Sequence, residues 1–372
     1  MNNRAFKEIN IEHLQHNVKE LQRIMKKDCK IMAVVKANAY GHGAAVIASS
    51  LNQMNINAFA VATVDEGIEL RKCKIKGEIL ILGYSNPKRA KEIKEYDLTQ
   101  TLIDYDYACS LKEENIKVKT HIKIDTGMHR LGFAVHETSY MEEVFSWDCF
   151  DITGIYTHLC VPESLLETDI IFTRQQIASF YQVLSILERK GITIPATHIQ
   201  SSYGLMNYPE LQCDYARIGI ALYGTASSKG IKTKCTLDLK PVLSLKSPIV
   251  LIRTIKRGES VGYGRSFFAK RDTRIAILPI GYGDGLPRNL SGTLKMVMIN
   301  EKMAPIVGKI CMDQIAVDVT DIENVKPLDI ATLIGNKEEK EPIAEEMAEY
   351  SESITNEILC RMGERLDCRL LS

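Results

Sequence analysis

The length, composition and charge of the chain narrow the class of protein to expect. The chain has 372 residues, of which 45% are hydrophobic, so it can bury a large core and is predicted to form two domains. Lysine plus arginine equals aspartate plus glutamate at 47 each, so no net field favours nucleic acid or an anionic membrane surface. These values exclude a disordered chain and indicate a protein that acts on small molecules.

Ten cysteines are scattered from Cys29 to Cys368 without a CxxC pair, a pattern that argues against both a zinc site and a disulfide framework. We therefore expect no metal and a reducing, cytoplasmic location. No stretch resembles a signal peptide, and no apolar run approaches the ~20 residues needed to span a bilayer. If the natural protein has a membrane domain, we expect it outside this chain.

Eight short apolar runs alternate with helical patterns up to about residue 230. They are Ile31–Val35, Ala58–Ala62, Ile79–Leu82, Thr99–Ile103, Val118–Ile124, Ile152–Tyr156, Ala196–Ile199 and Tyr215–Ile218. Continuous apolar runs are typical of parallel strands buried on both faces, and eight such repeats predict a (β/α)8 barrel over residues 1–234. An open doubly wound sheet is the alternative, but the glycine-rich phosphate fingerprint expected after its first strand is missing.

The pattern changes after a polar linker at residues 227–234. Short β-type runs follow without long helices between them, at Val242–Leu245, Ile249–Ile252, Ile275–Ile280, Met296–Ile299, Ile315–Val319 and Ile330–Leu333. This spacing predicts a mostly-β domain over residues 235–372. Near the end, Ile343–Met362 is predicted to be helical, with an interruption at Ser351–Thr355 where serine and threonine supply N-cap side chains.

The most informative segment is Ala33-Val-Val-Lys-Ala-Asn-Ala-Tyr-Gly-His-Gly43, because it places a lysine where an apolar strand gives way to a glycine-rich turn. A lysine at a barrel mouth can be desolvated, which lowers its pKa and makes it a Schiff-base nucleophile. Barrel active sites lie at the carboxyl ends of the strands, so the polar residues after each run are candidates. These are Lys36, Tyr40, Lys123, Arg130, His158, Ser201, Ser202, Arg217, Gly219 and Ile220.

Seven ordered motifs extend across both predicted domains. They are residues 33–43, 123–132, 156–158, 216–224, 261–264, 281–285 and 311–313. Together they resemble the motifs of the alanine racemase family, and the resemblance covers essentially the whole chain. It implies a pyridoxal 5'-phosphate cofactor and a head-to-tail homodimer in which the partner's β domain completes each active site.

The resemblance also implies the catalytic roles. Racemisation needs two acid/base groups on opposite faces of a flat intermediate. Lys36 would hold the cofactor covalently and act on the D-enantiomer, and Tyr263 of the partner subunit would act on the L-enantiomer, supported by His158 and Arg217. Arg217 would face the pyridine nitrogen, to which a guanidinium can donate a hydrogen bond but not a proton.

The binding roles follow in the same way. Tyr40, Ser202 and the backbone N–H groups of Gly219 and Ile220 would hold the cofactor phosphate. Arg130 and the Met312 backbone would hold the substrate carboxylate, and the substrate site also includes Asp313, Tyr282 and Lys123. In some relatives the lysine matching Lys123 is carbamylated, and a plain salt bridge is an equally open alternative here.

Two positions depart from the family pattern. Asn356 stands where alanine racemases usually have a tyrosine, and Glu163 stands at an entrance position usually held by aspartate. Asparagine is smaller and offers both donors and an acceptor, so it would admit and bind a serine hydroxyl. The pair resembles the racemase domain of the membrane serine racemases linked to vancomycin resistance, which make D-serine for peptidoglycan precursors. Asn356 as a simple helix-start cap is the alternative.

Three other functions compete with a serine racemase. A housekeeping alanine racemase has the same motifs. A pyridoxal-phosphate decarboxylase of basic amino acids has the same architecture, but residues 261–264 and 311–313 fit the racemase pattern better. A non-enzymatic cofactor carrier would lack the β domain and Tyr263, since a fold alone does not determine function.

Overall fold

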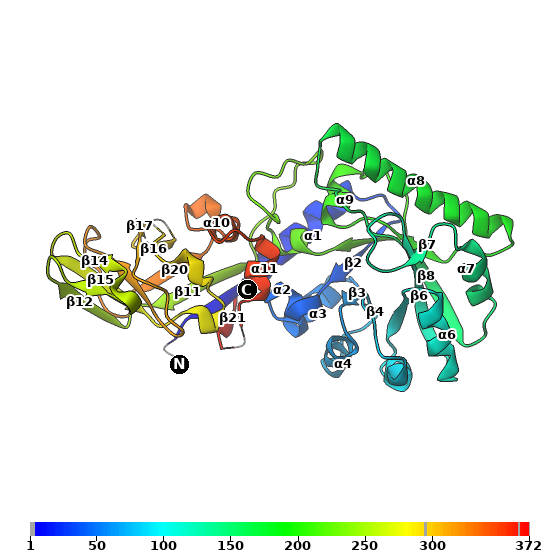
Figure 1. The fold of residues 1–372 in the computed structure, drawn as a ribbon, viewed down its shortest axis with the longest axis horizontal. Helices are drawn as coiled ribbons and strands as arrows, with labels where there is room; N and C mark the ends of the chain where they lie inside the picture. The colour runs from blue at the N-terminus through cyan, green and yellow to red at the C-terminus, as the bar shows by residue number, and fades with distance from the viewer. Residues whose placement is uncertain (1–3, 294–295, 364, 372) are drawn as a thin grey trace.

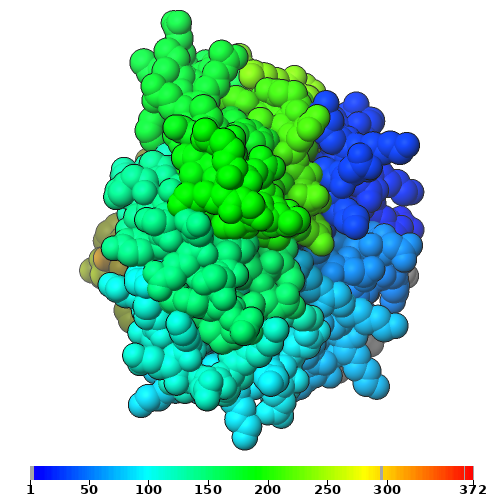
Figure 2. All heavy atoms as spheres, turned by 90° about the vertical axis from the view of Figure 1, so that its right-hand side faces the viewer, coloured from blue at the N-terminus to red at the C-terminus, as the bar shows by residue number. Residues whose placement is uncertain are grey.

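The computed structural model describes residues 4–293, 296–363 and 365–371 of the chain. The barrel occupies one end of an elongated molecule and the mostly-β region the other (Figure 1). Figure 2 looks onto the barrel end, whose surface is formed by blue to yellow-green segments.

Eight parallel strands form the barrel. They are hydrogen-bonded in the order β2, β3, β4, β5, β6, β8, β9 and β10, and the pairing of β10 with β2 closes the ring. Their bounds are β2 (Lys30–Val34), β3 (Ala58–Val61), β4 (Glu78–Ile81), β5 (Thr99–Leu102), β6 (Val118–Asp125), β8 (Phe150–Tyr156), β9 (Ala196–His198) and β10 (Tyr215–Ile218). A short strand, β7 (Phe133–Ala134), extends the end of β6. The predicted (β/α)8 architecture is confirmed.

Helices cover the outside of the barrel because each presents one apolar stripe to it. They are α1 (Ile11–Ile24), α3 (Ala44–Gln53), α4 (Val64–Lys72), α5 (Ala90–Glu95), α6 (Tyr105–Glu113), α7 (Thr138–Phe145), α8 (Glu167–Arg189) and α9 (Ser202–Asn207). In the longest of them, α8, the buried stripe includes Phe180, Leu184 and Leu187.

The interior of the barrel has an apolar side and a polar side. On the apolar side, β2, β3 and β4 contribute Met32, Ala60 and Leu80 to one buried cluster. On the polar side, His121 of β6 and His198 of β9 are buried. A buried polar side chain needs a hydrogen-bond partner, so this side of the interior has to be a connected network.

The β region contains three sheets. A six-stranded sheet has the order β17, β16, β20, β11, β1, β21, a four-stranded sheet has the order β12, β15, β19, β18, and β13 pairs with β14. The bounds are β1 (Phe6–Asn10), β11 (Leu243–Pro248), β12 (Leu251–Ile255), β13 (Ser260–Val261), β14 (Phe267–Phe268), β15 (Thr273–Leu278), β16 (Val297–Ile299), β17 (Lys302–Ala304), β18 (Ile306–Val307), β19 (Ile315–Asp318), β20 (Ile330–Ile334) and β21 (Asp367–Leu371). All six predicted runs lie on strands, so the mostly-β prediction is confirmed.

The first strand of the chain was not predicted, and it lies in the sheet of the β region. β1 pairs antiparallel with β11 and parallel with β21, so both ends of the chain meet in one sheet. Its partners are more than 230 residues away in sequence, and no local pattern indicates such a pairing. The predicted domain boundary between residues 234 and 235 therefore does not account for β1. For the other segments of the chain it stays a prediction.

Two short helices, α10 (Ala344–Tyr350) and α11 (Thr355–Cys360), follow β20. The predicted interruption between them is present, but the predicted serine or threonine cap is wrong. Ile354 occupies the N-cap position of α11 and makes no side-chain cap. The first N–H of the helix, that of Thr355, donates instead to the carbonyl of Ser227 at 2.9 Å, which satisfies one of the N–H groups that a helix start leaves without an intrahelical partner.

All ten cysteines are free thiols, as the sequence predicts. Among the described residues, none of the helices combines the length and the apolar character that crossing a membrane would require. Short 3-10 helices complete the fold at η1 (Pro87–Arg89), η2 (Ile220–Tyr223), η3 (Tyr263–Arg265), η4 (Tyr282–Asp284), η5 (Arg288–Leu290) and η6 (Lys337–Glu339).

Candidate active site

A cavity of about 660 Å³ lies at the carboxyl ends of the barrel strands. It brings together most of the residues singled out from the sequence, although they come from different strands and from α11. The predicted residues that line it are Lys36, Tyr40, Lys123, Arg130, His158, Glu163, Ser201, Ser202, Arg217, Gly219, Ile220 and Asn356.

Lys36 stands at the start of an unusual left-handed turn. The next four residues, Ala37 to Tyr40, have φ values of 52–53°, although none of them is glycine. A left-handed conformation costs roughly 1–2 kcal/mol for each such residue, so the turn persists only because its surroundings hold it. The turn places Lys36 and Tyr40 on the wall of the same cavity.

Side chains outside the motif hold this turn. Glu66 accepts hydrogen bonds from the backbone N–H of Ala37 at 2.8 Å and of Ala62 at 2.6 Å, which joins the turn to the end of β3. The buried ammonium of Lys7 on β1 donates to the carbonyl of Gly41 at 2.8 Å. The β region thus helps to position the segment that carries Lys36.

Tyr223 contacts the chain on both sides of the turn that begins at Lys36. Its hydroxyl donates to the carbonyl of Val34 at 2.8 Å, and its ring stacks on His42 at a centroid distance of 4.4 Å. Neither Tyr223 nor the tethers Lys7 and Glu66 were picked out by sequence reasoning. Their roles depend on contacts across the fold, which a single sequence does not display.

Both lysines of the cavity have lowered pKa values. Burial is the main cause for Lys36, and the positive charge of Arg130 adds to it. Burial and Arg130 likewise lower the pKa of Lys123 to about 8. Removing an amine from water disfavours its charged form, so both amines lose a proton more readily here than they would in water.

Arg217 is buried beneath the cavity and makes a set of directed hydrogen bonds. Its Nη2 donates to the carbonyl of Thr157 at 2.7 Å and to Nδ1 of His158 at 3.1 Å. A guanidinium has no acceptor, so Nδ1 of His158 must accept and the ring proton lies on Nε2. Burial, reinforced by Arg217, holds the pKa of His158 well below its usual value, so the positive charge here resides on Arg217.

Another part of the cavity wall is lined by hydroxyl groups. Oγ of Ser202 accepts from the backbone N–H of Gly219 at 3.2 Å and of Ala221 at 3.3 Å. A Cβ on Gly219 would lie 2.7 Å from the hydroxyl oxygen of Tyr40, so only glycine leaves room for this tyrosine. Burial raises the pKa of Tyr40 to about 12, which keeps its hydroxyl protonated and able to donate.

The predicted site residues of the β region lie elsewhere in this chain. Tyr263 is 68% exposed, Met312 52% and Tyr282 41%. Tyr263, Met312 and Asp313 line a separate concavity of about 460 Å³, and none of these residues lines the Lys36 cavity. A single chain therefore does not bring the two groups together, and their supply by a partner subunit stays a prediction.

Ion pairs and hydrogen bonds nevertheless hold these residues of the β region in place. Arg365 bonds to Asp313 at 2.5 Å and lies 3.4 Å from the buried carboxylate of Asp284. Asp284 accepts from the N–H of Gly281 at 2.9 Å. Asp284 belongs to the motif at residues 281–285, but nothing in the sequence pattern indicates a role for its carboxylate.

Asn356 lies in the first turn of α11 and its side chain lines the Lys36 cavity. Its Oδ1 is shielded and has no hydrogen-bond partner among the described residues. Because Ile354 is the N-cap, the alternative that Asn356 serves only as a helix cap is wrong. A buried amide oxygen without a partner is costly, so this oxygen is suited to a ligand.

The fold and the site together define a parallel barrel with a desolvated strand-end lysine and a second, mostly-β domain. The family model for the alanine racemase N-terminal domain matches residues 9–227, and that for the C-terminal domain matches residues 242–370. The chain belongs to the alanine racemase family.

Curated relatives and solved structures agree with this assignment. The chain is 52% identical over 364 residues to an amino-acid racemase of Enterococcus faecalis and 41% identical over 367 residues to a serine/alanine racemase of Enterococcus gallinarum. It is matched over 98% and 99% of its length, but spans only 51% of each relative. An alanine racemase structure from Clostridium difficile 630 has a TM-score of 0.92 at 30% identity, covering 100% of this chain and 96% of that one.

Proposed function

We propose that this chain is a pyridoxal 5'-phosphate-dependent racemase domain that interconverts the enantiomers of serine and of alanine. The Lys36 cavity carries the proposal, because it combines a desolvated amine, a buried guanidinium at Arg217 and the unpartnered amide oxygen of Asn356. The family assignment supports racemisation, and the serine/alanine racemase of E. gallinarum supports this pair of substrates.

The residues present fit the cofactor. The corner between Tyr40, Ser202 and Gly219 offers the hydroxyl donors of Tyr40 and Ser202 to a phosphate, beside the Gly219 N–H that donates to Ser202 in this chain and in space that a Cβ would fill. Lys36 offers the amine for covalent attachment. Arg217 offers its Nε–H to the ring nitrogen, because its Nη1 and Nη2 groups already donate within the protein. When bound, the cofactor withdraws electrons from the α-carbon of the amino acid and so makes its hydrogen acidic.

Two groups of the protein then move the proton. Neutral Nζ of Lys36 removes the proton from one face of the α-carbon, and its ammonium form returns one there. Tyr263 of the partner subunit does the same on the other face, removing a proton as the phenolate and returning one as the phenol. Nε2–H of His158 is free to donate to the Tyr263 oxygen, because Nδ1 of His158 already accepts from Arg217. The buried charge of Arg217 is transmitted to the tyrosine oxygen through this imidazole.

The remaining predicted residues bind the amino acid. Arg130 is positioned by a loop in which Oδ1 of Asp125 accepts from the N–H groups of Gly127 and His129, each at 3.0 Å. Arg130 and the backbone N–H of Met312 would hold the substrate carboxylate, with Lys123, Asp313 and Tyr282 around them. The proposal therefore includes a homodimer with two shared sites.

Asn356 is the residue that indicates serine as a substrate. An apolar pocket discriminates against an added hydroxyl by only about 100-fold, so one polar group is enough to change the preference. The product D-serine would serve peptidoglycan precursors, the role expected from the resemblance to the vancomycin-resistance racemases, and the domain would act in the cytoplasm.

Purified, cofactor-saturated protein tests this assignment. Racemisation of L-serine and L-alanine is followed by circular dichroism, and Asn356→Tyr should lower the ratio of kcat/KM for serine to that for alanine on the order of 100-fold. Asn356→Leu is the matched control, because it keeps the volume and removes the amide. If the tyrosine variant keeps its serine preference, Asn356 is not the determinant; if wild type uses only alanine, the domain is a housekeeping alanine racemase.

Two further assays distinguish a racemase from a decarboxylase and from a cofactor carrier. Borohydride reduction of the loaded protein followed by peptide mapping should find the pyridoxyl group on Lys36 and nowhere else. Carbon dioxide release from lysine, ornithine or arginine would identify a decarboxylase, and stable cofactor binding without racemisation would identify a carrier.

A further inference from the structure

A line of polar side chains crosses the barrel interior and ends at Arg217. Nη1 of Arg217 lies 2.7 Å from Nδ1 of His198, and Nε2 of His198 lies 2.9 Å from Nδ1 of His121. Nε2 of His121 lies 2.8 Å from Oε1 of Glu78, although this last contact is poorly aligned for a hydrogen bond. The line joins the active-site arginine to a carboxylate at the amino end of β4.

The donors and acceptors of the four groups fix the direction in which hydrogen bonds are donated along the line. Arg217 can only donate, so Nδ1 of His198 accepts and the ring proton of His198 lies on Nε2. That proton is donated to Nδ1 of His121, so the proton of His121 also lies on Nε2, facing Glu78. Both imidazoles are thereby neutral, each in one tautomer.

The two imidazoles have little freedom to turn. The His198 ring stacks on Tyr156 with a centroid distance of 4.5 Å and an interplanar angle of 8°. The His121 ring lies over Gly154, where a Cβ would approach it to 2.4 Å, and the pairing of β6 with β8 shifts register at this residue. Both histidines are completely buried.

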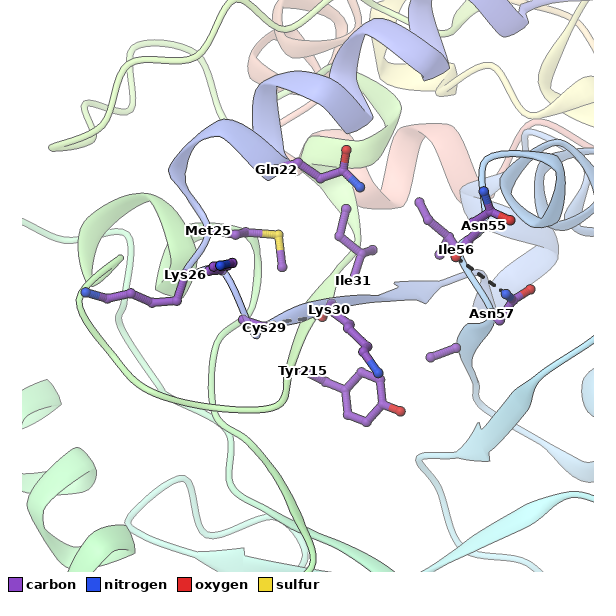
Figure 3. Close-up of a pocket in the computed structure, with 12 residues that line it drawn as sticks. Gln22, Met25, Lys26, Cys29, Lys30, Ile31, Asn55, Ile56, Asn57 and Tyr215 are labelled. Carbon is purple, nitrogen blue, oxygen red and sulfur yellow. Dashed lines mark hydrogen bonds between the residues drawn. The ribbon is translucent and has the colours of Figure 1, made fainter.

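The outer end of the line lies near a second cavity, of about 490 Å³, at the amino ends of the strands. In Figure 3, Lys30 and Tyr215 point toward the same space. The Tyr215 ring meets His198 edge-on at 6.3 Å, and Glu78 adds to burial in raising the pKa of this tyrosine. The side chain of Glu78 is 20% exposed, so its carboxylate is partly hydrated.

Arg217 has no carboxylate of its own. None of the ion pairs within the described parts of the chain involves it, and burial lowers its pKa to about 10. An imidazole oriented by a distant carboxylate provides a directed acceptor without placing a negative charge beside the arginine. Such outer partners fix the tautomer and the orientation of the group that contacts the reacting centre.

We propose that Glu78, His121 and His198 are positioning residues for Arg217. Glu78 stabilises the Nε2–H tautomer of His121, which is the one that donation by Arg217 through His198 requires, and His198 thereby presents the acceptor that holds the guanidinium beneath the cavity. The catalytic effect expected from these residues rests on the proposed function, in which Arg217 faces the cofactor ring.

The test begins with the cofactor-free protein and needs no racemase activity. Nitrogen-15 NMR of the histidine rings should show His121 and His198 neutral with the proton on Nε2, assigned with His121→Asn. Glu78→Leu should introduce the Nδ1–H tautomer at His121, while Glu78→Gln, whose amide oxygen still accepts, should retain the wild-type tautomers. Glu20→Leu is the control, because Glu20 is also 20% exposed and pairs with Arg23 on α1.

The loaded enzyme gives the second readout. Glu78→Leu should lower kcat about 10-fold, with KM for the amino acid changed less than twofold, and Glu78→Gln should restore most of kcat. A wild-type His198 that is protonated or carries its proton on Nδ1 overturns the inference, even if Glu78→Leu does not fold. Unchanged tautomers in a folded Glu78→Leu variant also overturn it. Expected tautomers without any racemisation would support the positioning role of the three residues and reject the proposed function instead.

Discussion

The two groups of predicted site residues differ in how completely one chain builds them. In the barrel group, Arg217 is buried and Lys36 is half-buried, and the segments that carry them are held by hydrogen bonds that involve side chains of β1, α4, β10 and η2. The β-region group, around Tyr263 and Met312, is more than half exposed at these two residues and lines a different concavity. A chain can therefore assemble a desolvated amine by itself while the phenol of Tyr263 stays exposed.

The largest expected effect tests whether the two groups act across a dimer. Lys36→Ala and Tyr263→Phe should each lower racemisation by at least about 100-fold, because each removes one acid/base group. Unfolding and refolding the two variants together should restore about a quarter of wild-type activity, since half of the dimers would be hybrids with one intact site each.

A chain that carries both substitutions is the control for this mixing experiment, and it should rescue neither variant. Mass spectrometry of differently tagged chains establishes that hybrids have formed. Hybrids without activity would show that Lys36 and Tyr263 do not share a site across the dimer.

The second-largest expected effect tests whether contact with α11 restrains the turn that follows Lys36. Gly41 has φ of +79°, and a Cβ there would lie 2.1 Å from the carbonyl oxygen of Leu359 on α11. Gly41→Ala should lower the free energy of unfolding by about 3 kcal/mol, from the left-handed backbone and the clash together. Urea unfolding of cofactor-free protein measures it.

Gly191→Ala is the matched control. Gly191 has φ of +85° but nothing within 4 Å of its Cβ position, so only the backbone cost of about 1 kcal/mol should remain. Equal losses in the two variants would mean that contact with α11 does not restrain the turn after Lys36.

The smallest effect concerns the desolvation of the barrel group. The pKa of Lys123 is lowered to about 8 in the fold, so between that value and the usual lysine range the unfolded chain binds more protons than the folded one. Stability should therefore rise with pH across this window and be lower below pH 8, where the buried amine is charged. Lys123→Met should be more stable than wild type at pH 7 and should flatten the rise.

Thermal melts of cofactor-free protein between pH 7 and 10.5 measure this effect. Lys119→Met, which changes a half-exposed lysine on the same strand, should keep the wild-type slope. A carbamylated Lys123 would give the opposite result at pH 7, because bicarbonate would then stabilise wild type but not Lys123→Met. An unchanged slope in Lys123→Met would contradict the desolvation argument.

The sequence predicts the barrel and the candidate site well for a definite physical reason. Buried parallel strands require continuous apolar runs, and barrel chemistry lies where those runs end, so Lys36, His158 and Arg217 could be found by position. The left-handed turn at residues 37–40 could not be predicted. Of its residues only asparagine favours that conformation, and one asparagine does not predict four such conformations in succession.

The supporting side chains could not be found from local pattern either. His121 lies within a run that reads as an ordinary strand, and Lys7 lies in a strand whose partners are at the far end of the chain. What distinguishes both residues is the group across the fold that they contact. Asn356 became informative only when compared with the tyrosine expected in the family.

The pairing of β1 with β11 and β21 has a consequence for synthesis. The barrel can close once β10 has left the ribosome, because its last pairing is with β2. Both edges of β1, however, are paired only after β11 and then β21 have been made. Contacts this distant in sequence form late, so a newly made barrel carries a strand with an unpaired edge, open to pairing with another chain, until β21 has been made.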